Sequence, residues 1–172
     1  EPIGCRDLGT VIKLNNHGIE NYFSGCLTLT LEPRGFEKEN FILVIDANVP
    51  DEYKNENIKR CKNTINLSTL KYSNEEQLLQ IGLDTLEQIE KAKLVITSRL
   101  HVMAPCLAFG TKVIFKPNEK ANGNTSLHNN TSFHSDRYKG IEDFLDKPEE
   151  FKVFQQNMKE NIIKEIYDKY YK

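Results

Sequence analysis

The sequence predicts an α/β domain with a mostly parallel, Rossmann-like sheet flanked by helices. Residues 41–45 and 94–97 are short, uninterrupted apolar runs rich in β-branched side chains, as is typical of strands covered on both faces. The second run leads directly into a helical pattern at 100–109, closed by Gly110, and then into another apolar run at 112–115. A strand, a helix and a strand in such close succession predict a parallel, right-handed crossover. The 172 residues can bury one substantial core.

The first part of the chain predicts a short helix and then a strand. Apolar residues recur at helical spacing from residue 7 to residue 16, and Gly18 follows where a helix end favours a residue without Cβ. Residues 22–23 are expected to be a strand. In residues 26–31 leucine alternates with threonine, which favours a strand by its period, although a short helix after Ser24 and Gly25 fits as well.

The middle of the chain predicts a short strand at 64–67 and a long helix after it. Ser73 and Glu76 have the spacing of a capping box, with Ser73 as the residue that accepts from an early helix amide. An apolar stripe at helical spacing follows from Leu78 to Ile89. These features indicate an amphipathic helix that leads into the strand at 94–97.

The remaining residues predict a long loop and two helices. Residues 117–135 are rich in Asn, Ser and Gly without periodicity, so we expect a loop, with a lid over the ligand as one hypothesis. A short helix is expected at 141–145 and a long amphipathic helix from residue 148. We therefore expect one Rossmann-like domain over residues 1–147 and a helix over 148–172 that packs on it.

Composition excludes several classes of protein. The formal charge is -2, so no basic excess points to nucleic acid or to an anionic membrane. No apolar run reaches the roughly 20 residues of a membrane span, and residues 1–7 lack a signal pattern, so we expect a cytoplasmic protein. The cysteines lack metal-binding or CxxC spacing and are expected to be buried, reduced thiols without a metal: Cys5, Cys26, Cys61 and Cys106.

The residues most suited to chemistry follow the strand at 94–97, where Thr97, Ser98, Arg99 and His101 lead into a helix. Open α/β sheets bind ligands at this edge, and helix N-termini attract anions there. Arginine offers a planar cationic fork and histidine can donate a proton near neutral pH, which suits acid-assisted transfer from an anionic substrate. Local spacing equally allows a salt bridge at Arg99 and a helix-capping role for His101.

The same segment resembles the polysaccharide pyruvyl transferase family. The resemblance lies in residues 92–101 (AKLVITSRLH) and 105–114 (PCLAFGTKVI), and in residues 3–7, 22–31 and 135–141 in matching order. It implies a fold similar to glycosyltransferases with two Rossmann-like halves. It also implies transfer of the enolpyruvyl group of phosphoenolpyruvate to a sugar hydroxyl, forming a pyruvate ketal, with no cofactor besides this donor.

The resemblance implies roles for individual residues. Arg99 and His101 match the family's Arg-Leu-His, which is implied to hold phosphoenolpyruvate with His101 as the proton donor. Arg6 matches the Arg of an Arg-Asp motif, although an ion pair with Asp7 explains it too. Arg137 follows the polar loop and is expected to close on the ligand or to be solvated at a helix start. Thr97 and Ser98 are expected to donate to the anion or to cap the helix. Ser24 and Gly25 stand where many relatives carry Asp-Pro, so the role of that motif is unassigned in this chain.

Relatives of this kind carry another α/β half before the Arg-Asp motif. We therefore expect this chain to be the phosphoenolpyruvate-binding half, completed by a missing N-terminal half or an oligomeric partner. Two other functions stay open: a glycosyltransferase half that binds a nucleotide sugar, and a non-catalytic module that binds anions or another protein.

Overall fold

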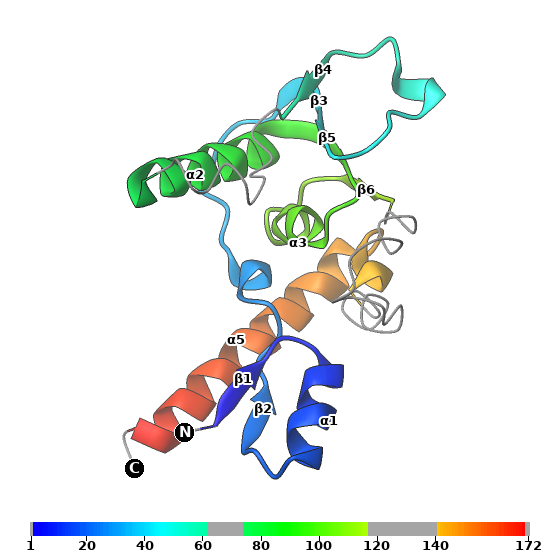
Figure 1. The fold of residues 1–172 in the computed structure, drawn as a ribbon. Helices are drawn as coiled ribbons and strands as arrows, with labels where there is room; N and C mark the ends of the chain where they lie inside the picture. Colours follow the sequence, from blue (N-terminus) through cyan, green and yellow to red (C-terminus); the bar gives the residue numbers. More distant parts are fainter. Residues whose placement is uncertain (1, 62–73, 117–140, 171–172) are drawn as a thin grey trace. The chain divides into compact units, whose positions relative to one another are not determined.

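The computed structural model describes residues 2–61, 74–116 and 141–170 (Figure 1). The predicted strand at 64–67, Ser73, the predicted loop at 117–135 and Arg137 lie outside the described residues. The chain forms two compact units. We call Glu1–Leu31 with Glu119–Lys172 the terminal unit, and Glu32–Asn118 the sheet unit. The predicted division into residues 1–147 and 148–172 stays a prediction.

The sheet unit contains a four-stranded parallel sheet in the order β4-β3-β5-β6. Its strands are β3 (Glu39–Ile45), β4 (Ile58–Arg60), β5 (Ala92–Thr97) and β6 (Val113–Phe115). The parallel arrangement of β5 and β6 around the intervening helix confirms the predicted topology. The sequence did not predict β4, because a three-residue edge strand that contains Lys59 and Arg60 carries too little apolar pattern.

Both faces of the central strands are buried, as their apolar runs predicted. On one face Phe41, Leu43 and Ile45 pack with residues of α2 (Glu75–Lys91) and α3 (Leu100–Ala108). On the other face Ile42, Val44 and Ile96 pack against the segment after β3, through Ala47, Val49 and Tyr53. The sheet unit is therefore layered, with α2 and α3 on one side and, on the other, residues 47–53, which end in the 3-10 helix η2 (Asp51–Tyr53).

The two helices of the sheet unit lie where the sequence predicted them. The N-cap of α2 is Asn74, whose side chain accepts a hydrogen bond from the backbone N of Gln77, one residue later than the predicted cap at Ser73. Asparagine caps a helix as well as serine does, so the capping-box pattern misplaced the start by one residue. Gly110 has φ +65 just after α3, as expected for a residue that ends a helix.

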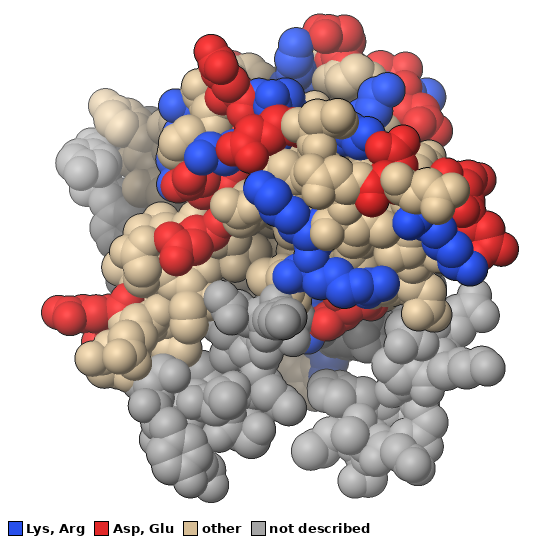
Figure 2. Space-filling view, turned by 90° about the horizontal axis from the view of Figure 1, so that it is seen from above, with Lys and Arg blue, Asp and Glu red and all other residues tan. Residues whose placement is uncertain are grey.

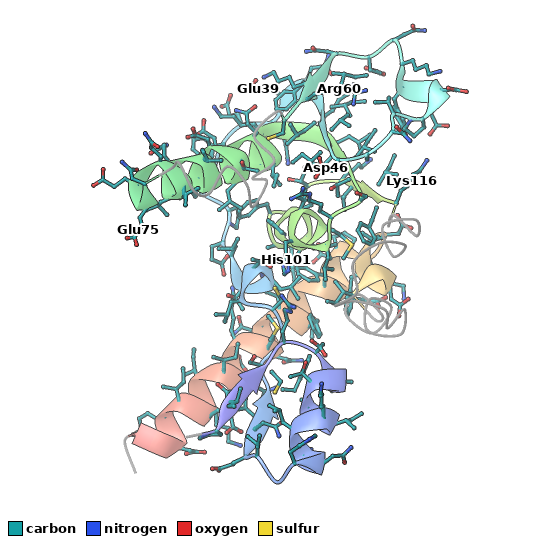
Figure 3. All side chains as sticks on the ribbon, viewed as in Figure 1. Glu39, Asp46, Arg60, Glu75, His101 and Lys116 are labelled. Atoms are coloured by element: carbon teal, nitrogen blue, oxygen red, sulfur yellow. The ribbon has the colours of Figure 1, made fainter. Side chains whose placement is uncertain are left out.

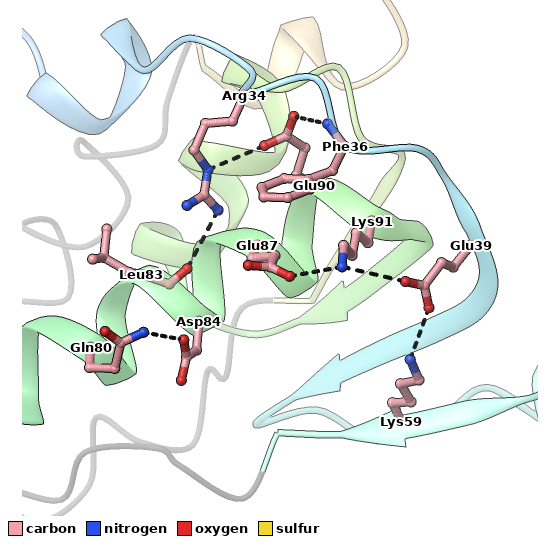
Figure 4. Close-up of polar contacts among 10 residues, drawn as sticks. All are labelled: Arg34, Phe36, Glu39, Lys59, Gln80, Leu83, Asp84, Glu87, Glu90 and Lys91. Carbon is pink, nitrogen blue, oxygen red and sulfur yellow. Dashed lines mark hydrogen bonds and ion pairs between the residues drawn. The ribbon is translucent and has the colours of Figure 1, made fainter.

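A polar network fixes the segment before β3 to the last turns of α2 (Figure 4). The buried carboxylate of Glu90 accepts from the backbone N of Gly35 at 2.7 Å and of Phe36 at 3.1 Å, and Arg34 lies 3.6 Å away. Burial raises the pKa of Glu90, but these backbone donors and the charge of Arg34 outweigh it and hold the pKa below its usual value. Glu90 therefore stabilises the fold as an anion.

The terminal unit contains β1 (Ile3–Cys5), α1 (Leu8–Asn16) and β2 (Asn21–Phe23), with β1 and β2 parallel. The predicted helix and the predicted strand are both confirmed. Asp7 is the N-cap of α1, with its carboxylate accepting from the backbone N of Thr10 at 2.8 Å and from the hydroxyl of the same residue at 2.9 Å. Asp7 thus contributes to helix formation.

Residues 26–31, for which strand and helix were both open, form a 3-10 helix, η1 (Leu27–Thr30). Leu29 is 1% exposed and Leu27 is 66% exposed, so alternate leucines do not share one buried face as a strand would require. The side-chain amide of Gln155 donates to the backbone O of Leu29 at 2.7 Å and of Leu31 at 3.1 Å. Gln155 belongs to α5 (Pro148–Tyr170), the predicted long helix, and a 3-10 turn, η5 (Glu142–Phe144), replaces the predicted short helix before it.

Candidate functional site

The candidate site lies at the carboxyl ends of β3 and β5. In the sheet order β4-β3-β5-β6, the chain passes from β3 to β4 on one side of β3 and later returns to β5 on its other side. The order therefore reverses between β3 and β5, and open α/β sheets bind ligands in the crevice at such a point. Ile45 and Thr97 are partners in the register, which brings the residues after them, Asp46 and Ser98, next to each other.

Three contacts hold the residues at this edge. The carboxylate of Asp46 forms an ion pair with Nε of Arg99, and the hydroxyl of Ser98 donates to the backbone O of Asp46 at 2.6 Å. The hydroxyl oxygen of the buried Thr97 accepts from the backbone N of Arg99 at 3.0 Å. The salt bridge that local spacing allowed for Arg99 is present, and it uses only one edge of the guanidinium.

The start of α3 adds positive partial charge to the same place. Arg99 is the N-cap residue, and its backbone O accepts from the backbone N of Val102 at 3.1 Å and of Met103 at 3.0 Å. Thr97 and Ser98, for which helix capping was one of two expected roles, are therefore not the N-cap, because α3 begins at Leu100, directly after Arg99. Figure 3 shows Asp46 beyond β3 and His101 on α3.

Arg99 and His101 come together at one cavity of about 420 Å³. Ile45, Val102 and Pro105 also line it, together with apolar side chains of α2 such as Leu86 and Ile89. His101 is exposed, and the side chain of Arg99 is 48% exposed. A cationic side chain and a titratable ring thus border a largely apolar cavity, an arrangement that can bind an anion and protonate a group next to it.

Arg6 lies in the terminal unit, directly after β1 and before α1. It is partly buried between Cys5 and Asp7, which are both buried. This is the same kind of position that Arg99 has in the sheet unit, between a parallel strand and a helix N-terminus. Arg137, the remaining candidate, lies outside the described residues.

Asp46 is the residue of this site that the sequence analysis missed. It directly follows the apolar run at 41–45, and its contact with Arg99 depends on how β3 and β5 pair. The signal that could have found it is the first polar residue after a buried strand whose parallel neighbour leads into Arg99.

The four cysteines form no disulfide, and Cys61 lines the same cavity as Arg99 and His101. Cys5 and Cys106 are buried, while Cys26 and Cys61 are partly buried. Burial raises the pKa of the Cys5 and Cys106 thiols, and nearby Asp7 raises that of Cys5 further. Within residues 2–61, 74–116 and 141–170, no group of three His, Cys, Asp or Glu side chains could hold a metal ion.

Charge on the visible surface is mixed. Lys and Arg side chains are interspersed with Asp and Glu on the face that Figure 2 displays, in keeping with the formal charge of -2. Among the described residues, no helix is both long and apolar enough to cross a membrane.

The parallel sheet with this strand-end site defines a Rossmann-like α/β protein. A model of the polysaccharide pyruvyl transferase family matches residues 1–120, which is more than half of the chain, and the chain belongs to this family of transferases. The matched residues include Arg6, Thr97, Ser98, Arg99 and His101. Neither the curated proteins nor the solved structures gave a match.

Proposed function

We propose that this chain is the phosphoenolpyruvate-binding domain of a polysaccharide pyruvyl transferase. It would transfer the enolpyruvyl group to a sugar hydroxyl of a polysaccharide or its precursor. The observation that carries the proposal is Arg99 at the strand-end switch point, beside His101, in a chain of this family. Phosphoenolpyruvate bears a phosphate and a carboxylate, and a guanidinium fork at a helix N-terminus suits either group.

The chemistry needs one proton donor and two hydroxyl groups of the sugar as nucleophiles. His101, acting as a general acid, donates a proton to the methylene carbon of phosphoenolpyruvate, which leaves a cation at the carbon that carries the phosphate. A sugar hydroxyl attacks this carbon and gives its proton to His101, which is neutral after the first step. Phosphate then leaves with the electron pair of its C–O bond, and a second hydroxyl of the sugar attacks the same carbon and closes the ketal, its proton leaving with the phosphate. Arg99 stabilises the negative charge of the donor and of the leaving phosphate.

Further residues support this donor site. From the family resemblance we assign Arg6 and Arg137 to the phosphate or carboxylate. The side chain of Thr97 is buried and the hydroxyl of Ser98 is bonded to Asp46, so we propose that both act on the anion through Arg99. The hydroxyl of Ser98 has one proton, which it donates to the backbone O of Asp46, so its contribution to the ligand is through Arg99 and Asp46. No cofactor is needed beyond the donor itself.

The acceptor and a protein partner complete the proposal. Transferases of this family act on a sugar acceptor, and we propose that a second α/β half, from the same polypeptide or from an oligomeric partner, forms the acceptor side. The terminal unit supports this, because Leu8 and Ile12 of α1 are each 60% exposed and Leu27 is 66% exposed. Isolated two-stranded sheets are marginal, and apolar surface of this kind favours a further layer.

Two variants test the roles of Arg99 and His101. Arg99→Ala removes the anion contact, so phosphoenolpyruvate binding is lost in calorimetric titration. His101→Ala leaves binding within a few-fold and removes turnover, measured as phosphate release with a sugar acceptor and the completing half. Lys112→Ala is the control: Lys112 is an exposed cation directly before β6, at the end of the strand away from the candidate site. This variant should leave binding and turnover unchanged.

The alternatives give different results. Binding of UDP-sugar or GDP-sugar in place of phosphoenolpyruvate would make this a nucleotide-sugar-binding half of a glycosyltransferase. Binding of phosphoenolpyruvate without product, in the presence of the other half, would make it an anion-binding module. Equal and mild effects of Arg99→Ala and His101→Ala would contradict the assigned roles.

A further inference from the structure

Asp46 has an unusual backbone conformation for its place in the sheet unit. Its φ is +50, and it is the one non-glycine residue with positive φ in the part of the chain that the structure describes. Glycine adopts this left-handed region without steric cost, whereas a residue with Cβ is disfavoured there, although aspartate tolerates it better than most. Strained residues of this kind cluster at ligand sites.

Two contacts tie Asp46 to the residues after β5. Its carboxylate pairs with Nε of Arg99, and its backbone O accepts from the hydroxyl of Ser98 at 2.6 Å. Ser98 and Arg99 are consecutive, so both contacts join Asp46 to the same short segment. The contact with Ser98 fixes the backbone of Asp46, and the ion pair orients the guanidinium of Arg99. Figure 3 shows Asp46 at this end of the sheet.

The ion pair itself contributes little to folding. The side chains of Arg99 and Asp46 are 48% and 34% exposed, and exposed pairs of this kind have small effects on stability. Glycine at this position would relieve the backbone and lose only that small contribution. The carboxylate therefore matters more for the orientation of Arg99 than for the stability of the sheet unit.

We propose that Asp46 is a positioning residue that holds the Nε edge of Arg99, so that the two terminal Nη groups are presented to the anion. This deepens the proposed function and rests on it for the identity of the anion. A guanidinium has five N–H donors in a fixed plane, and with its Nε edge held it can still form two parallel hydrogen bonds to a phosphate or carboxylate through Nη. Asp46 touches Arg99 and acts through it.

The test compares Asp46→Gly, Asp46→Asn and Asp51→Asn in the 172-residue chain. Asp51 is in the same segment, 91% exposed and paired with Lys54, so its variant removes an equal charge away from Arg99. Thermal unfolding of Asp46→Gly should occur at the same or a higher temperature than that of the unsubstituted chain. Its affinity for phosphoenolpyruvate should fall about tenfold and that of Asp46→Asn about threefold, since a charged hydrogen bond is lost or becomes neutral. Asp51→Asn should match the unsubstituted chain.

A second measurement does not depend on the donor. The NMR signal of Arg99 Nε–H, assigned with Arg99→Lys, should be protected from exchange in the unsubstituted chain and should lose that protection in Asp46→Gly. An unchanged signal overturns the proposal, and so does equal or tighter phosphoenolpyruvate binding by Asp46→Gly. If the signal responds but the unsubstituted chain binds no phosphoenolpyruvate, the positioning of Arg99 stands and the proposed function fails.

Discussion

The hydroxyl of Ser98 donates to the backbone O of Asp46 at 2.6 Å and so joins the ends of two neighbouring parallel strands. The two residues are 52 positions apart in the chain, and the contact exists because β3 and β5 pair with Ile45 opposite Thr97. It lies where the strand order reverses, which is where α/β sheets bind ligands. The geometry of the candidate site is thus a consequence of the sheet.

Ser98→Ala removes this contact, and we expect it to lower the free energy of unfolding by about 1 kcal/mol, the usual net value of one hydrogen bond. Because the hydroxyl proton is directed to Asp46, the affinity for phosphoenolpyruvate should fall by less than about tenfold, a smaller loss than that of an essential anion donor. Urea unfolding and calorimetric titration measure the two effects, with Ser98→Thr as the hydroxyl-retaining control. Unchanged stability with a large loss of affinity would mean that Ser98 donates directly to the ligand.

Glu90 makes the stability of the sheet unit depend on acidity. Its pKa is lowered in the folded state, so its stabilisation is complete above the ordinary value of 4.5 and is lost as the pH falls through the lower, folded-state pKa. Glu90→Ala leaves the backbone N–H groups of Gly35 and Phe36 without their acceptor and should cost about 2 kcal/mol at neutral pH.

Unfolding in urea as a function of pH measures this effect. The difference in stability between the unsubstituted chain and Glu90→Gln should shrink below pH 4.5. Glu87→Gln, which changes an ion pair with Lys91 on the same helix, is the control and should have a small effect. A difference that stays constant down to strongly acidic pH would show that the charge of Glu90 contributes nothing.

Gln155 fixes η1 in the terminal unit. Gln155 is 9% exposed, and its side-chain amide donates to the backbone O of both Leu29 and Leu31. Gln155→Ala should cost about 2 kcal/mol, because two carbonyl groups lose their donor and one of them is in a buried contact. Gln156→Ala on the same helix removes an exposed contact with Glu160 and should cost less than about 0.5 kcal/mol. Equal unfolding midpoints for the two variants would rule out this role of Gln155.

Position 25 requires glycine for two reasons, its backbone conformation and the lack of space for a Cβ. It has φ +67, and a Cβ placed on it would lie 2.4 Å from Sδ of Met158. Gly18 has φ +66, but no described atom lies within 4 Å of a Cβ placed there. Gly18→Ala should therefore cost about 1 kcal/mol from backbone strain alone, and Gly25→Ala should cost more. Thermal unfolding of the two variants separates strain from overlap, and equal costs would mean that Met158 moves away freely.

The backbone at Gly25 also bears on the Asp-Pro pair that the family resemblance leads us to expect in place of Ser24 and Gly25. A proline ring fixes φ near −65°, and the observed φ of Gly25 is +67, so this backbone is closed to proline. The segment has a different conformation here from the one that proline would impose.

Long, strongly periodic elements of the fold could be predicted from the sequence. The apolar runs of β3 and β5 and the stripe of α2 carry enough residues to show their period. The short strands β1 and β4 were not predicted, because each contains a single isoleucine and no apolar β-branched run. The equally short β6 is wholly apolar and was predicted. The segment of η1 alternates Leu and Thr like a strand, but its conformation depends on Gln155, which lies more than 120 residues further along the chain.

The residues of the candidate site could likewise be predicted only in part. Arg99 and His101 could be found because they follow a recognisable strand and begin a helix. Asp46 could not, because its role depends on the pairing of β3 with β5 and on a left-handed backbone that the apolar run before it does not encode.

The most direct test of the central claim is calorimetric titration of the chain with phosphoenolpyruvate, alongside UDP-sugar and GDP-sugar. We predict saturable binding of phosphoenolpyruvate alone, abolished by Arg99→Ala and retained by Lys112→Ala. Binding that survives Arg99→Ala, or binding of a nucleotide sugar in place of phosphoenolpyruvate, would contradict it.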